Sequence, residues 1–264
     1  MHESRIVEIA IYLKRNKIIE TTKLQIRAYD MVLSFMERWD TVKQHGEELI
    51  YSGAWIVTIG TVISAVGQTN KTFTESQMGA NLISKGNAIE AFGNSLVAIG
   101  NTALFSEERE SYLIDMIFGA WLQAAGNVTN TVATNIEINT ADEGAIGLNA
   151  VGSGIQGLGA TYEAIGALEG HSPVKSLEVT GNSLFALGAF LDAAGLLFSM
   201  KNLNIAGDRL SFIGSWTQVI GAITVVIALK TASDINLAQQ QDYYYPYYNY
   251  HLAHLYEPNS YRMI

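Results

Sequence analysis

The sequence contains no cysteine, which excludes a disulfide framework, a thiolate nucleophile and a thiolate-bound metal. It contains only 3 prolines, and none precedes Pro173, so nothing before that point interrupts long helices. Charged residues make up only 16% of the chain, and the mean hydropathy is +0.15. This composition is apolar for a soluble protein, but its hydropathy is too low for a bundle of simple membrane spans.

Basic side chains are also scarce, because residues 49–238 hold 7 basic and 15 acidic residues. Nucleic-acid binding needs a basic stripe that neutralises phosphates, so we expect no nucleic-acid partner. The start of the chain, residues 1–8, has no apolar run after a basic segment. We therefore expect no secretory signal, and synthesis and residence in the cytosol.

Glycine is abundant, and its spacing is the main feature of the sequence. Eighteen of the 24 glycines recur at intervals of seven: Gly53, Gly60 and Gly67; Gly79, Gly86, Gly93 and Gly100; Gly119 and Gly126; Gly152, Gly159 and Gly166; Gly181, Gly188 and Gly195; Gly207, Gly214 and Gly221. Large apolar residues follow many of these glycines at the third and sixth positions, and alanine often stands at the fifth. A period of seven is typical of packed helices and not of strands.

A longer repeat of 33 residues groups these heptads into units, with anchors at Gly53, Gly86, Gly119 and Gly152. Such a period indicates stacked supersecondary units. We predict an all-α fold of about six glycine-heptad helices in residues 51–235. Because the links between them are short, neighbours should be antiparallel in a bundle or a layer.

The glycines carry a cost that the fold must offset. Each glycine inside a helix destabilises it by about 1 kcal/mol relative to alanine. Over eighteen positions the sum is on the order of 10 kcal/mol, comparable with the net stability of a domain. Close approach of two helix backbones is the available gain, because glycine has no Cβ and allows additional dispersion contacts. We therefore predict that the heptad glycines are close-packing sites.

Two further segments flank the repeat. Residues 1–50 show apolar residues at three- and four-residue steps, which predicts an N-terminal amphipathic helix, or two helices with a break near Asn16. Whether this segment packs on its own chain or on another copy is open. Residues 236–264 contain a low-complexity run that predicts an irregular tail, with tyrosines at Tyr243, Tyr244, Tyr245, Tyr247, Tyr248 and Tyr250.

Glycine-mediated packing occurs both in water and in lipid. Residues 210–229 carry no charge and are long enough to cross a bilayer. However, Glu90, Glu163 and Asp192 interrupt other apolar runs, and Asn87 and Gln156 add further polarity. These interruptions favour a soluble bundle over a membrane-embedded one.

No catalytic or metal-binding pattern emerges, so we expect no enzyme activity and no cofactor. His251 and His254 are three apart but have no third ligand beyond Glu257. The run Gly152–Gly157 matches a dinucleotide fingerprint, yet it lies in a predicted helix and follows no strand. Glu90, Glu163 and Asp192 could form a buried pocket, but we favour a solvated face or a paired core charge as the explanation for them. Three tryptophans at equivalent repeat positions should anchor the core or a subunit contact: Trp55, Trp121 and Trp216.

The Gly-Asn-small-apolar heptads at Gly86 and Gly181, the 33-residue repeat and the tyrosine tail resemble the repetitive glycine-heptad proteins of spore-forming bacilli. The tail is similar in composition to tyrosine-rich spore-coat proteins, which implies cohesion or cross-linking and a place in spore surface layers. The leading hypothesis is therefore a non-enzymatic structural protein that self-assembles with its own copies or with coat-like proteins. The alternative is a membrane-embedded, pore- or holin-like protein, and a third hypothesis is a small-molecule binder with a pocket at the three acids.

Overall fold

The structure, a computed structural model, describes the backbone of residues 23–74, 77–140 and 143–255, and the side chains of residues 42–74, 77–140 and 144–239. Within these ranges it contains six α-helices and no strand, which confirms the predicted all-α fold. The helices are α2 (Lys23–Thr74), α3 (Gln77–Glu108), α4 (Tyr112–Thr140), α5 (Glu143–Glu169), α6 (Lys175–Ser199) and α7 (Asn204–Leu255).

The chain divides into two units, Met1–Gln44 and His45–Ile264. In its described part the first unit is helical backbone that begins at Lys23. The second unit contains all the glycine heptads. The division falls inside α2, which runs without a break through the domain boundary predicted at residue 50, because no proline or helix-ending motif stands there.

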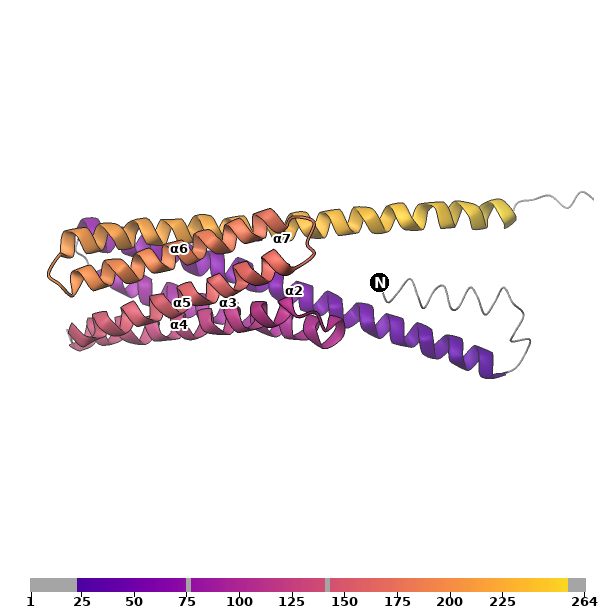
Figure 1. The fold of residues 1–264 in the computed structure, drawn as a ribbon, viewed down its shortest axis with the longest axis horizontal. Helices are drawn as coiled ribbons and strands as arrows, with labels where there is room; N and C mark the ends of the chain where they lie inside the picture. Colours follow the sequence, from indigo (N-terminus) through magenta and orange to yellow (C-terminus); the bar gives the residue numbers. More distant parts are fainter. Residues whose placement is uncertain (1–22, 75–76, 141–142, 256–264) are drawn as a thin grey trace, which may run out of the picture. The chain divides into compact units, whose positions relative to one another are not determined.

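The helices of the second unit form an antiparallel up-and-down bundle (Figure 1). Sequential neighbours pack on one another from α3 through α7. The bundle also closes between α2 and α7, where the Trp216 indole Nε1 donates to Thr69 Oγ1 at 3.1 Å and the Phe73 and Phe212 rings meet edge to face. Each helix of the bundle therefore has two neighbours, and the six helices surround a common interior.

Short links join the helices. Asn202, between α6 and α7, adopts a φ of 59°, a left-handed conformation that asparagine tolerates better than most residues. Before α6, the Ser172 hydroxyl accepts from the Val174 N–H at 3.3 Å and donates to Glu178 Oε1 at 2.8 Å. The first of these turns closes the α6–α7 pair, and the second joins α5 to α6.

The structure differs from the prediction of an irregular tail in the backbone of the tyrosine run. Helix α7 continues to Leu255, so the backbone of the tyrosine run from Tyr243 to Tyr250 is helical. Extending an existing helix is easier than nucleating a new one, and this offsets the backbone hydrogen bond that Pro246 cannot donate. The side chains of Tyr243, Tyr244, Tyr245, Tyr247, Tyr248 and Tyr250 lie outside the described residues, as do those of His251 and His254.

Candidate functional site

The predicted close-packing glycines lie between antiparallel neighbours in three hairpins, α2–α3, α4–α5 and α6–α7. They face one another in pairs: Gly46–Gly100, Gly53–Gly93, Gly60–Gly86 and Gly67–Gly79; Gly119–Gly159 and Gly126–Gly152; Gly181–Gly221, Gly188–Gly214 and Gly195–Gly207. Gly166 lies against the carbonyl of Tyr112 instead. Gly46, one heptad before Gly53, was missed in the sequence although its spacing identifies it.

The pairs are close enough to exclude any side chain. A Cβ built on Gly53 would lie 2.7 Å from the carbonyl oxygen of Gly93, and one on Gly93 would lie 2.8 Å from that of Gly53. At Gly126 the corresponding distance to the Gly152 oxygen is 2.6 Å. Such separations place the Cα–H groups of one helix against the carbonyls of the next, which allows weak Cα–H···O hydrogen bonds.

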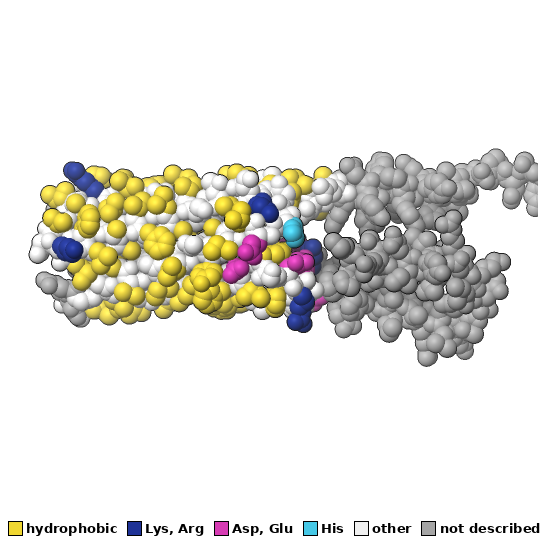
Figure 2. Space-filling view, in the orientation of Figure 1, with side chains coloured by type: hydrophobic (Ala, Val, Ile, Leu, Met, Phe, Trp, Pro, Cys, Tyr) yellow, Lys and Arg dark blue, Asp and Glu magenta, His cyan; other side chains and the backbone are white. Residues whose placement is uncertain are grey.

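The outward face of the bundle is apolar. Among the described residues, 32 large apolar side chains are exposed. On the face drawn in Figure 2, hydrophobic side chains spread along the bundle, whereas charged side chains gather toward its ends. Trp55, Trp121 and Trp216 are 45%, 46% and 38% exposed. The expectation that they anchor the core is wrong, because they follow heptad glycines at the second position, which points away from the interior. A contact with another molecule stays a prediction.

The inward face is made of alanine, glycine and polar side chains. The buried apolar residues are mostly alanine, and the larger ones are Val57, Leu113, Phe185, Leu196, Val219 and Val226. The buried polar residues include Asn87, Glu90, Asn94 and Asn101 of α3; Gln123, Asn127, Asn130 and Thr134 of α4; and Asn149, Ser153, Gln156 and Glu163 of α5. The bundle thus reverses the usual distribution of a soluble protein, in which large apolar residues are inside.

Glu90 is at the centre of one hydrogen-bond network. Its side chain is 1% exposed. Oε1 accepts from the Ser64 hydroxyl at 2.8 Å, and Oε2 accepts from Gln156 Nε2 at 3.1 Å. The same Gln156 nitrogen lies 3.1 Å from Asn127 Oδ1, so the network joins α2, α3, α4 and α5. Glu90 is neither solvated nor paired with a cation among the described residues, so both explanations offered from the sequence are wrong for it.

Asp192 of α6 belongs to a second network. It is partly buried, and its Oδ2 accepts from the Ser153 hydroxyl at 2.8 Å. The Ser153 oxygen accepts in turn from Asn130 Nδ2 at 3.3 Å. The backbone carbonyl of Asp192 accepts from the Ser211 hydroxyl at 3.4 Å. This network extends the polar interior from α4 through α5 and α6 to α7.

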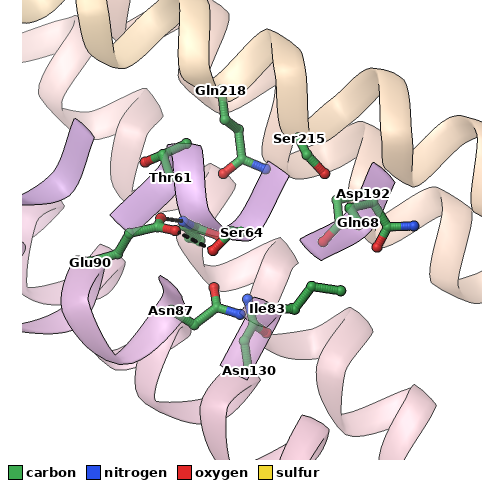
Figure 3. A pocket seen from close by; sticks show the side chains of 11 residues that line it. Thr61, Ser64, Gln68, Ile83, Asn87, Glu90, Asn130, Asp192, Ser215 and Gln218 are labelled. Atoms are coloured by element: carbon green, nitrogen blue, oxygen red, sulfur yellow. Dashed lines mark hydrogen bonds between the residues drawn. The ribbon is translucent and has the colours of Figure 1, made fainter. Parts of the chain in front are cut away.

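A small cavity lies where the two networks approach each other (Figure 3). Its volume is about 30 Å³, and every helix of the bundle contributes to its lining. The lining residues are Thr61, Ser64 and Gln68 of α2; Ile83, Asn87 and Glu90 of α3; Asn130 of α4; Gln156 of α5; Asp192 of α6; and Ser215 and Gln218 of α7. Ile83 is the one apolar residue among them, so the cavity is suited to water or to a small polar or charged species.

Several buried polar atoms of the interior have no hydrogen-bond partner in the described part of the chain. They are Asn94 Nδ2, Asn101 Nδ2, Asn127 Nδ2, Asn130 Oδ1, Glu137 Oε2 and Glu163 Oε1. Buried groups of this kind are normally satisfied by protein or by bound water. Their number along α3, α4 and α5 therefore indicates an interior that admits water or another polar species.

Glu163 is the third acid singled out in the sequence, and the structure separates it from the other two. It is buried beside Gly119 and does not line the central cavity. The predicted three-acid pocket is thus wrong in its membership, since only Glu90 and Asp192 share a cavity. Glu163 has no cationic partner among the described residues, and its burial excludes the solvated face that the sequence allowed.

The other motifs do not form a site. Gly152–Gly157 lies inside α5, where Gly152 and Gly159 serve helix packing. No group of three or more His, Cys, Asp or Glu side chains in the described residues could hold a metal ion.

The interior residues were missed as a group, although the sequence carries a signal for them. Polar side chains recur at the first and fourth positions after the heptad glycines, as at Asn87 and Glu90 after Gly86. Gln68 after Gly67 and Asn101 after Gly100 follow the same rule, and both are buried within helices. The sequence interpretation did not consider a polar interior.

The model of one protein family matches residues 48–226, and this is a family of unknown function (DUF6944). No curated protein and no solved structure matches the chain. The matched range begins in α2 and ends in α7. It includes the three glycine hairpins and the polar interior, but not the tyrosine run.

Proposed function

Since the chain belongs to the family of unknown function DUF6944, we propose a function from its own geometry: a membrane-embedded six-helix bundle that provides a passage for small polar species through its interior. One observation carries this proposal, the reversal of the usual surface and core. Large apolar side chains face outward, and amides, hydroxyls and carboxyls face inward.

In water this arrangement would be unfavourable. Burying a Val, Leu, Ile or Phe side chain is worth about 1.5–3 kcal/mol, and the bundle leaves 32 large apolar side chains exposed. Soluble monomers rarely expose contiguous apolar patches beyond a few hundred Å². In a bilayer the same side chains face hydrocarbon, and the hydrogen-bonded helices leave few backbone groups unsatisfied.

The positions of the charges support this orientation. Each helix has a central band in which no charged side chain faces outward. These bands are residues 52–70, 86–104, 116–136, 144–168, 179–200 and 210–229. These bands are about 20 residues long, the length that crosses a hydrocarbon core of about 30 Å. The bands contain only three charged residues, and these are Glu90, Glu163 and Asp192 of the inward face.

Three helices are long and apolar enough on composition alone to cross a membrane: Val42–Thr74, Lys175–Ser199 and Asn204–Gln239. The other three carry most of the buried amides and acids, which lower their average hydropathy. Asn87 and Gln156, which favoured a soluble bundle in the sequence, are both buried. That reason for preferring a soluble protein therefore no longer applies.

Fractionation tests membrane embedding directly. We expect the full chain to remain in the membrane pellet after an alkaline carbonate wash and to be released only by detergent. Recovery as a monodisperse protein in buffer without detergent would refute the proposal.

Because the chain has no cysteine, single cysteines report local exposure without background. We expect Val128→Cys and Ile220→Cys, on the outward face, to resist a membrane-impermeant maleimide in intact vesicles. Ser106→Cys and Asn202→Cys, near the helix ends, serve as matched controls that should be labelled from one side or the other. Ser64→Cys, in the cavity lining, should react with the silver ion, a thiol reagent small enough for this cavity, if small ions enter.

Self-assembly through the helical faces and the tail, the leading hypothesis from the sequence, remains the second candidate. The specific observation in its favour is the exposure of three tryptophans at equivalent repeat positions, which could bind a neighbouring copy as well as lipid. This candidate includes a place in spore surface layers beside coat-like proteins. Ordered particles formed without detergent would favour self-assembly.

A further inference from the structure

The central cavity is small, and its size limits what it can hold. It is about 30 Å³, which is room for about two water molecules or one small ion. It is lined by residues of all six helices and lies at the level of the bands that carry no outward-facing charge. Larger solutes do not fit without a rearrangement of the bundle.

The lining supplies oxygen atoms, and two of its residues are acids. Glu90 and Asp192 contribute carboxyl groups, and serine, threonine, asparagine and glutamine side chains contribute neutral oxygens. None of the described residues that line the cavity is lysine or arginine, so an anion would have no counter-charge there. Histidine and cysteine are also missing from this lining, and without soft donors transition metals are disfavoured relative to ions that prefer oxygen.

A second observation, independent of the acids, points to a bound species. Asn130 lines the cavity, is 2% exposed, and has no hydrogen-bond donor for its Oδ1. Its Nδ2 is engaged with Ser153, whose hydroxyl donates to Asp192. A buried carbonyl oxygen that lacks a donor is an available ligand for a positive ion beside the carboxyl group of that network.

We propose that this cavity binds one alkali-metal cation through oxygens of Glu90, Asp192 and Asn130, and this rests on the proposed membrane function. Two carboxyl groups with neutral oxygens in about 30 Å³ suit one small ion without its water shell, and magnesium, which keeps several of its waters, is disfavoured in so small a space. Calcium sites use six to eight oxygens, commonly with several carboxylates, and no cluster of three acidic or histidine side chains exists in the described residues. Charged residues at membrane depth typically mark an ion pathway, and Glu90 has no cationic partner among the described residues.

The test uses the full chain purified in detergent and titrated with NaCl or KCl by calorimetry, with choline chloride as the ionic-strength control. We expect saturable binding of Na⁺ or K⁺ that weakens at least tenfold in Glu90→Gln and in Asp192→Asn. Glu163→Gln is the matched control, because it removes a buried carboxyl group of α5 that does not line the cavity. Circular dichroism of each variant checks folding, and the two cavity variants act as independent tests if one fails to fold.

Absence of Na⁺ and K⁺ binding by the folded wild-type protein would overturn the inference, as would equal binding in all variants or binding of Ca²⁺ alone. A protein that stays in the membrane after carbonate but binds no alkali ion would refute this inference and leave the proposed membrane function intact. A protein that is soluble without detergent would refute the proposed function first.

Discussion

At the scale of single residues, glycine and asparagine decide how this bundle packs. The paired glycines place no Cβ of their own on the line of closest approach within each hairpin. The polar residues beside them, such as Asn87 after Gly86, are directed inward by the same heptad register. Close approach and a polar interior are therefore consequences of one repeated sequence unit.

The glycine pairs can be tested within a single helix. Gly159→Ala in α5 would place a Cβ 2.6 Å from the Gly119 carbonyl oxygen, and overpacking of this kind costs about 1–3 kcal/mol. Gly154→Ala in the same helix meets no atom within 4 Å, so the higher helix propensity of alanine should stabilise it by up to about 1 kcal/mol. We expect thermal unfolding in detergent, followed by circular dichroism, to show a lower Tm for Gly159→Ala but not for Gly154→Ala. Equal Tm values would contradict the close packing.

At the scale of elements, the unit of construction is the antiparallel hairpin. Each of α2–α3, α4–α5 and α6–α7 is closed by glycine pairs, whereas contacts between hairpins use larger and more polar side chains. Examples are Ser84 donating to Asn135 across α3 and α4 at 3.1 Å, and Lys71 bound to Glu137 at 3.1 Å across α2 and α4. Three similar hairpins surround the interior.

Closure between the first and last helices makes this arrangement a ring, and cross-linking can test it. A bifunctional maleimide should join Thr69→Cys to Trp216→Cys, because the Trp216 indole reaches Thr69. A protease site inserted at Glu110 separates the two halves of the chain, so the linked halves should migrate together on a denaturing gel. Phe92→Cys with Trp216→Cys is the control pair, since these positions also lie on opposite sides of the protease site and α3 and α7 are not neighbours. If both pairs cross-link equally, the closed ring is wrong.

At the scale of the whole molecule, the described bundle offers no apolar core large enough to explain its stability in water. Its larger apolar side chains are mostly outside, and its interior is held by glycine contacts and hydrogen bonds. An apolar surrounding, whether lipid or other copies of the chain, would supply the missing burial. Membrane embedding and self-assembly would both bury these side chains. The bands without outward-facing charge favour the membrane.

Deletion of the tyrosine tail distinguishes membrane embedding from self-assembly. Deletion of Gln239–Ile264 should leave the glycine-heptad helices folded, since the paired glycines all lie before this segment. If the tyrosine tail drives assembly, the truncated protein should lose large particles in light scattering while its helical content is kept. If membrane embedding dominates, truncation should change neither the carbonate-resistant pellet nor the particle size in detergent. An unfolded truncated chain would show that the tail is part of the bundle.

How much of this could be predicted is clearest from particular residues. The spacing of Gly53, Gly60 and Gly67 predicted helices, and the all-α fold follows from it. Trp55 was expected in the core or a contact, because an apolar side chain in water is normally buried. Its position on the outward face could not be derived without knowing which flank of the helix meets the interior.

The sequence by itself determined the helices and the seven-residue register of their glycines, since both depend on interactions local to one helix or to a repeated unit. Only the tertiary structure decided which face of each helix is inside. A heptad with one apolar and one polar flank can pack either way, and the surrounding solvent selects between them. The meeting of Glu90 and Asp192 at one cavity, from helices far apart in the chain, likewise depends on the closure of all six helices.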